Sequence, residues 1–467
     1  MQTNIVCAPS NCNNGSLGTN CGPSTRHLFN PLHPHRCIPT THTIMASHSR
    51  EFSDESAASH DTTLSQDARI FSFSEPQTES SSDNNSTYET LRRNLSARTV
   101  VSTSSSFAHR MERAKAAYNS HLAVIGRGTC GTVFEIAGTE TAIKKGSDKQ
   151  GLWVDANLTN VACRAVVETK ALLESMFPGS SIPRVPQVYG WVRDEELEKW
   201  WEVNRSRFPD QDNATGYLFQ VQRILPISKA TRTALIKNYF PKEFHESSLA
   251  DPSNKACLVR PYLGMRRSDH EFDHPAETLQ NFPLHLDQME DIELDIALFS
   301  REIAIGLAVI HWRAGLDGMD VEFVLGSSAI GSELPPIVEH FESVQPFSIP
   351  AGDFTRRQTH LWMLDFDKAS KLDFNDWKKT RQQMVTAVTA NDPYFPNPAT
   401  SGESEELTWS AFEAAYLQAA DALLKIHPTL SKKARAKKYP EAFLVDWKKR
   451  AQSLEETKDG GFIQFST

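Results

Sequence analysis

Three glycines and a lysine near residue 130 have types and spacing that suit phosphate binding. Gly126, Gly128 and Gly131 lie in one short stretch, Val133 follows them, and Lys144 ends a second apolar run. Glycines let backbone N–H groups approach a phosphate without a side-chain clash. A lysine on the next strand can then neutralise phosphate charge. The pattern predicts two strands joined by a phosphate-binding glycine turn, followed by a strand that carries Lys144.

Two other interpretations of the glycines stay open. A dinucleotide-binding fold needs a helix directly after the glycines, whereas the β-prone residues 132–137 follow them here. The order of residues therefore favours a β-hairpin over a dinucleotide-binding turn. A hairpin that binds no ligand is the second alternative, because glycine strings of this kind also occur by chance.

The same residues resemble motifs of the protein kinases. The glycine-rich kinase motif is matched by Gly126, Gly128, Gly131 and Val133, and residues 142–144 resemble the strand that carries the kinase lysine. In kinases that lysine pairs with a glutamate of the following helix. The resemblance implies that Glu168 orients Lys144, with Glu174 as a competing candidate.

A polar turn after a long apolar helix resembles the kinase catalytic loop. Asp317 stands where the catalytic aspartate would, and Glu322 stands at the metal-binding asparagine. The resemblance implies that Asp317 accepts the proton of an attacking hydroxyl and that Glu322 binds Mg²⁺. Gly315 and Leu316 replace the expected His and Arg, and Met319 replaces a lysine that contacts phosphate. The alternative is that Asp317 caps a helix in an ordinary turn.

A third signal follows the apolar run 361–364. The string Leu364-Asp365-Phe366-Asp367 resembles the metal-binding D-F-G motif, with Asp367 in place of glycine. The resemblance implies that Asp365 binds Mg²⁺, and small-molecule kinases also carry an acidic residue soon after this aspartate. An ordinary turn at a strand end is the alternative. No A-P-E motif follows, so the peptide-docking part of a protein kinase is absent or rebuilt.

These residues need a scaffold that brings them together, and the hydrophobic pattern predicts its elements. In the first half we expect β-hairpins at 122–145, a helix at 160–176 and a strand at 217–225. In the second half we expect a long apolar helix at 291–313, an insertion at 327–358, a strand at 360–366 and a helix at 409–426.

Composition restricts the class of protein. The chain has 467 residues and a net charge of −9, which disfavours nucleic-acid binding. It has no apolar run long enough to cross a membrane and no signal peptide, so we expect a cytoplasmic or nuclear protein with reduced thiols. The segment 1–106 is rich in Ser, Thr, Asn and Pro and is predicted to be disordered, with Met45 as a second candidate start.

Several strings together resemble a fungal family of domains of unknown function that is often labelled "zinc finger protein". The strings that carry this likeness are 128–134, 311–312, 317–326, 364–367 and 390–394. The likeness spans about residues 120–450 and implies a kinase-like architecture without an established activity. The seven cysteines and the histidines show no finger spacing, so no zinc is expected.

We therefore predict an α+β, two-lobed protein-kinase-like fold: a disordered tail at 1–106, a β-rich N-lobe with one helix at 107–226, and a mostly helical C-lobe at 227–467. The predicted function is an ATP- and Mg-dependent phosphotransferase that acts on a small molecule. The alternative is a catalytically inactive pseudokinase that binds or scaffolds an unknown small-molecule or protein partner. A zinc-dependent nucleic-acid binder is a third interpretation, and it would require bound zinc.

Overall fold

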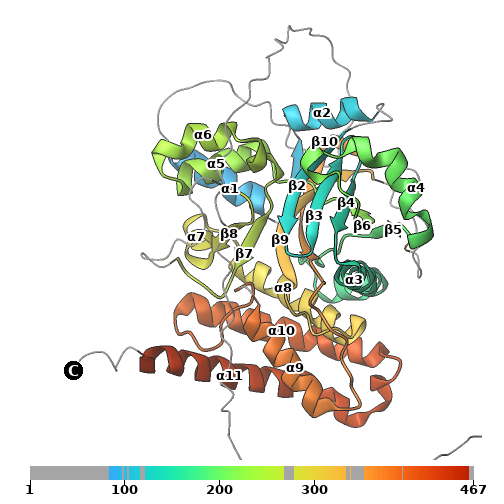
Figure 1. The fold of residues 1–467 in the computed structure, drawn as a ribbon. Coiled ribbons are helices and arrows are strands. Elements are labelled where there is room, and N and C mark those ends of the chain that lie inside the picture. The colour runs from blue at the N-terminus through green and yellow to red at the C-terminus, as the bar shows by residue number, and fades with distance from the viewer. Residues whose placement is uncertain are drawn as a thin grey trace, which may run out of the picture. The chain divides into compact units, whose positions relative to one another are not determined.

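The fold is mixed α+β and contains two five-stranded sheets (Figure 1), which confirms the predicted class. The structure, a computed structural model, describes residues 84–96, 99–102, 105–115, 121–267, 278–332, 337, 352–391 and 393–461. Most of the predicted disordered tail lies outside these residues.

The prediction of disorder is wrong for the last part of that tail, because this part forms secondary structure. It contains α1 (Asn84–Leu95), β1 (Val100–Ser102) and the start of α2 (Ser106–Ala114). Leu91 and Leu95 of α1 are fully buried, and α1 packs against α5. The polar composition of the tail hid a short amphipathic helix whose apolar residues share one face.

The first sheet is antiparallel throughout, in the order β2-β3-β4-β6-β5. Its strands and the two helices beside it are β2 (Leu122–Gly128), β3 (Gly131–Ile136), β4 (Thr141–Gly146), β5 (Val188–Trp191), β6 (Tyr217–Gln222), α3 (Lys149–Met176) and α4 (Asp194–Asn204). Phe134 packs with Trp201 of α4, whereas Phe219 packs with Leu152 of α3. Because strand side chains alternate between faces, this sheet is buried on both sides.

The second sheet has the order β1-β10-β9-β7-β8. The strands not yet bounded are β7 (Val259–Tyr262), β8 (Phe282–His285), β9 (Glu322–Ile330) and β10 (Asp353–Leu364). β8 runs parallel to β7, and the other pairs are antiparallel. β9 is buried along almost its whole length, as expected of a strand covered on both faces.

Helices form the layer below this sheet, shown in yellow to red in Figure 1. The main ones are α8 (Ile296–Val309), α9 (Trp377–Ala390), α10 (Glu403–Ile426) and α11 (Tyr439–Gly461). α8 is apolar nearly all round and packs against α10. A Cβ on Gly306 would lie 2.8 Å from Met363 Sδ, so this glycine lets α8 approach β10 closely. α8 runs into a π-turn over Ile310–Ala314 that ends at Gly315, with φ at 69°.

Three shorter helices are α5 (Lys229–Tyr239), α6 (His245–Ala250) and α7 (Leu286–Asp291), and α5 packs against both α1 and α6. In the part of the chain that the structure describes, no helix is long and apolar enough to span a membrane.

Backbone hydrogen bonds join the two sheets at two places. The chain leaving β6 pairs with β9, where the amides of Leu225 and Ser327 each donate to the other's carbonyl at 2.9 and 2.7 Å. The chain entering β5 pairs with β10, where Arg184 donates to Leu361 and accepts from Met363. These two backbone pairings fix the position of the end of β10 relative to β4.

The predicted insertion at 327–358 is also corrected. Residues 327–330 belong to β9 and residues 353–358 belong to β10, so the connection between these strands is 331–352. The charged residues of β10 concealed the strand, because Arg357 is buried and donates to the carbonyl of Pro226 at 2.9 Å. Of the connection, only 331, 332, 337 and 352 are described.

Candidate functional site

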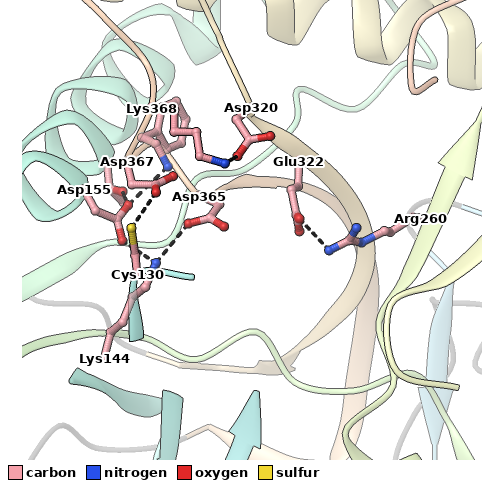
Figure 2. Close-up of polar contacts among 11 residues, drawn as sticks. Cys130, Lys144, Asp155, Arg260, Asp320, Glu322, Asp365, Asp367 and Lys368 are labelled. Atoms are coloured by element: carbon pink, nitrogen blue, oxygen red, sulfur yellow. Dashed lines mark hydrogen bonds and ion pairs between the residues drawn. The ribbon is translucent and has the colours of Figure 1, made fainter. Parts of the chain in front are cut away.

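Lys144 is the centre of a cluster of charged side chains. It lies on the central strand β4, between Val133 of β3 and Phe219 of β6. Its ammonium donates to Asp155 Oδ2 at 2.6 Å and to Asp365 Oδ1 at 2.9 Å (Figure 2). Burial lowers the pKa of Lys144, but the two carboxylates outweigh it and hold the pKa above its ordinary value. The lysine is therefore a permanent and largely buried cation, with 14 % of its side chain exposed.

The carboxylate that orients Lys144 is Asp155, which corrects the expectation for Glu168. Helix α3 begins at Lys149, earlier than predicted, and Asp155 in its second turn faces β4. Asp155 also accepts from the Phe366 amide at 3.2 Å. Glu168 lies farther along the helix, where it accepts from Arg313 Nε at 3.0 Å.

The predicted hairpin is present as β2 and β3, and its glycines line the cleft beside this cluster. Gly131 has φ at 150°, and a Cβ there would lie 2.2 Å from the Lys145 carbonyl oxygen, so the fold itself requires glycine. At Gly126 a Cβ would meet only Val133 Cβ at 3.9 Å, and at Gly128 it would meet nothing within 4 Å. Packing therefore does not explain the last two glycines, which leave backbone open to the cleft.

The tip of the hairpin contacts the turn after β10. Cys130 Sγ donates to Asp367 Oδ2 at 2.5 Å. Burial and this carboxylate raise the pKa of the Cys130 thiol to about 12. In the same turn, Asp365 adopts a left-handed conformation with φ at 66°. A non-glycine residue held there is strained, and such strain occurs preferentially at functional sites.

Asp317 does not occupy the position expected of a catalytic base, which is a second correction. Its Oδ1 accepts from the amides of Met319 at 3.1 Å and Ser370 at 2.9 Å, and its Oδ2 accepts from Gln383 Nε2 at 2.7 Å. The side chain is buried, and the described residues that line the cleft do not include it. Asp317 therefore holds its own loop against the segment after β10. This structural role is similar to the alternative of a capping aspartate in a turn.

Two other acidic residues of this region do line the cleft. Asp320 Oδ2 accepts from Lys368 Nζ at 2.5 Å, and Glu322 Oε1 accepts from Arg260 Nη2 at 2.5 Å. Glu322 thus lines the cleft, and its carboxylate pairs with an arginine of β7. Figure 2 shows both pairs near Asp365.

Sequence reasoning missed five residues of this site, namely Cys130, Asp155, Arg260, Asp320 and Lys368. Two features of the sequence could have pointed to Asp155 and Lys368. Asp148 is a helix N-cap, and its side chain accepts from the Gln150 amide at 2.9 Å, which marks the start of α3. Lys368 directly follows the acidic turn that contains Asp365.

The cleft has a volume of about 450 Å³. The hairpin and Lys144 line one part, whereas another part is lined by Ala256, Leu258, Arg260, Gln280 and Asn281. Among the residues that the structure describes, no group of three or more His, Cys, Asp or Glu side chains is arranged to hold a metal ion. The oxygen atoms that could bind a cation in the cleft belong to carboxylates that do not form such a group.

Comparison with known proteins gives one limited match. A family model for a domain of unknown function, described as "Zinc finger protein", matches residues 361–427. No curated protein and no solved structure matches significantly. The matched segment contains the end of β10, the turn with Asp365 and Asp367, α9 and α10. It has no cysteine and a single histidine, His427, so the residues of a zinc finger are not in it.

Proposed function

We propose that the protein is a protein-kinase-like domain that binds ATP and Mg²⁺ in the cleft and transfers a phosphoryl group to a small-molecule acceptor. The observation that carries the proposal is Lys144, a buried cation held by Asp155 of α3 and Asp365 at the end of β10. In kinases, a strand lysine binds nucleotide phosphates while a helix carboxylate orients it, and an aspartate at this place binds metal.

The surroundings of Lys144 suit a nucleotide. The antiparallel sheet with α3, followed by a largely helical second part, supports the two-lobed arrangement predicted from the sequence. Gly126 and Gly128 line the cleft with Lys144 and carry no side chain that would keep a phosphate away from the backbone. Phosphate oxygens would meet both a fixed cation and backbone donors there.

Asp365 and Glu322 would hold Mg²⁺, because carboxylate oxygens are its preferred protein ligands. The side chain of Asp365 is 31 % exposed and can accept a cation while it keeps Lys144. Glu322 would have to share its oxygens between the cation and Arg260. When bound, the metal would neutralise charge on the phosphates.

The short path after Asp365 favours a small acceptor over a peptide. Only residues 367–376 separate Phe366 from α9, and no A-P-E motif follows. These residues are anchored rather than extended, since the Ser370 amide donates to Asp317 and the Leu372 amide donates to Gly315. The segment between Phe366 and α9 is therefore too short and too firmly anchored to form a peptide-docking surface.

A pseudokinase is the second candidate, and a specific observation favours it. Asp317, which matches the kinase catalytic base only in the sequence motif, lies outside the cleft lining and is engaged by backbone and side-chain donors. A protein that binds nucleotide without transferring phosphate would have no need of a base in the cleft.

Thermal unfolding of the full chain with and without Mg-ATP tests nucleotide binding. A ligand that binds only the folded state adds about 2.7 kcal/mol at 100 times its Kd. We expect a metal-dependent rise that disappears in Lys144→Met and in Asp365→Ala. The matched control is Lys149→Met, which removes an exposed lysine of α3 that pairs with Asp194 outside the cleft. No shift at millimolar ATP in the folded wild type would refute the proposal.

ATP hydrolysis by the wild type above the Lys144→Met level separates the enzyme from the pseudokinase.

A further inference from the structure

Lys368 and Asp320 line the cleft and form a solvent-exposed ion pair that the kinase motifs do not anticipate. Lys368 belongs to the turn after β10, and Asp320 belongs to the loop before β9. Their Nζ and Oδ2 atoms lie 2.5 Å apart, and both residues line the same cavity as Lys144 and Asp365. Figure 2 shows the pair close to Asp365.

The loop holds Asp320 in a conformation that needs support. Its φ is 61°, in the left-handed region that non-glycine residues rarely adopt. Asn391 supplies the support: its Oδ1 accepts from the Asp320 amide at 2.6 Å, and its Nδ2 donates to the Gly318 carbonyl at 3.0 Å. Backbone strain maintained by a dedicated side chain is more common at functional positions than elsewhere.

The two residues replace two groups that the loop lacks. Asp317 is turned away from the cleft and bound by three donors. Met319 carries no charge where kinases have a phosphate-contacting lysine. Lys368 and Asp320 therefore bring a cation and a carboxylate into the cleft from different positions of the chain.

We propose that Asp320 is the proton acceptor of the phosphoryl transfer and that Lys368 binds the phosphoryl group that is transferred. This inference rests on the proposed function. Asn391 is a positioning residue, because it acts through the backbone of Asp320.

The step balances without any further reactant. Asp320 takes the proton of the acceptor hydroxyl as that oxygen forms a bond to the γ-phosphorus. The bond from this phosphorus to its bridging oxygen breaks, and the electron pair leaves with the nucleoside diphosphate. Lys368 lies beside the charge that develops on the phosphoryl oxygens. The Asp320 carboxylate raises the pKa of Lys368, so the ammonium stays charged.

Binding of ATP and ADP to the full chain, measured by calorimetry with Mg²⁺, tests Lys368 without relying on activity. Only ATP carries the phosphoryl group that Lys368 contacts. We expect Lys368→Met to weaken ATP binding about tenfold, which corresponds to about 1.4 kcal/mol, and to leave ADP binding within about twofold. The matched control is Lys371→Met, an exposed lysine of the same segment outside the cleft.

ATP hydrolysis, with water as the acceptor, tests Asp320. We expect Asp320→Asn to lower the rate about a hundredfold or more, as loss of a general base does, while ATP still binds. Asp421→Asn, an exposed carboxylate of α10, should change nothing. Asn391→Ala should lower kcat with little change in ATP affinity.

The outcomes separate this inference from the proposed function. Absence of Mg-ATP binding by the wild type would refute both. Binding and hydrolysis that survive in Asp320→Asn and Lys368→Met would overturn the inference and leave the phosphotransferase intact. Binding with no hydrolysis above the Lys144→Met level would remove the role of Asp320 and support the pseudokinase.

Discussion

Cys130 at the tip of the glycine hairpin and Asp367 in the turn after β10 are joined by a hydrogen bond, with Sγ and Oδ2 2.5 Å apart. This contact joins the hairpin of the first sheet to the turn that follows β10 of the second sheet. Because a partly buried thiol next to a carboxylate resists ionisation, we expect the contact to slow reaction of the cysteine with electrophiles.

We expect Cys130 to react slowly with iodoacetamide at pH 8, since its pKa of about 12 leaves little thiolate. Asp367→Asn removes the carboxylate and should accelerate alkylation of Cys130. Mass spectrometry of the modified peptides measures the rates. Cys163 and Cys257 are internal controls, because burial alone raises their pKa to about 12 and neither should respond to Asp367→Asn. Equal acceleration at all three would mean that the variant loosens the fold.

A second prediction separates the two candidate partners of Lys144. Asp155→Asn should lower the free energy of unfolding by about 3 kcal/mol, because it leaves a buried cation with one carboxylate fewer. Glu168→Gln should cost at most about 1 kcal/mol, since Glu168 is 43 % exposed and pairs with the half-buried Arg313. Urea denaturation measures both. The opposite ranking would show that Glu168 holds Lys144 in solution.

The sequence was sufficient to predict the local part of the site. Gly131, Lys144 and Asp365 lie in short strings whose backbone geometry depends on near neighbours, and they fall on the predicted hairpin, strand and strand end. Asp155 was missed because Lys149, Gln150 and Gly151 resemble a loop, and glycine disfavours a helix interior.

The choice between Asp317 and Asp320 could not be made from local sequence. Both residues stand in one polar turn, and the side chain that faces the cleft is decided by distant contacts. Ser370 and Gln383 bind the carboxylate of Asp317, whereas Asn391 holds the backbone of Asp320. Such contacts depend on how α9 packs, which no pattern within the turn encodes.

A third prediction concerns the glycines of the hairpin. Gly131→Ala should destabilise the protein by at least about 2 kcal/mol, because the new methyl group would meet the Lys145 carbonyl oxygen at 2.2 Å and φ is 150°. Gly128→Ala meets nothing within 4 Å, so stability should stay unchanged or rise by about 0.4–1 kcal/mol. Thermal denaturation measures the difference. Similar losses for both would contradict the hairpin geometry.

The fourth prediction is a loss of stability in acid that depends on His311. This side chain belongs to the π-turn after α8 and is fully buried, with Nδ1 2.7 Å from Oη of Tyr416 in α10 and Nε2 3.3 Å from the Asp317 carbonyl oxygen. Burial lowers the pKa of His311 from 6.5 to about 3, and the Asp317 carbonyl only partly opposes this. The imidazole is therefore neutral in the folded protein throughout the usual pH range.

The sign follows from the two pKa values. Above about pH 6.5 the histidine is neutral in both the folded and the unfolded state, so it does not change the free energy of unfolding with pH. Between about pH 6.5 and 3 the unfolded chain binds the proton more strongly than the folded protein, so stability decreases as the pH is lowered, by at most about 1.4 kcal/mol per pH unit. Urea denaturation between pH 4.5 and 7.5 measures the slope. His311→Gln should flatten it, whereas His109→Gln, an exposed histidine of α2, should leave it as in the wild type. An unchanged slope in His311→Gln would mean that His311 binds its proton equally well in the folded and unfolded states.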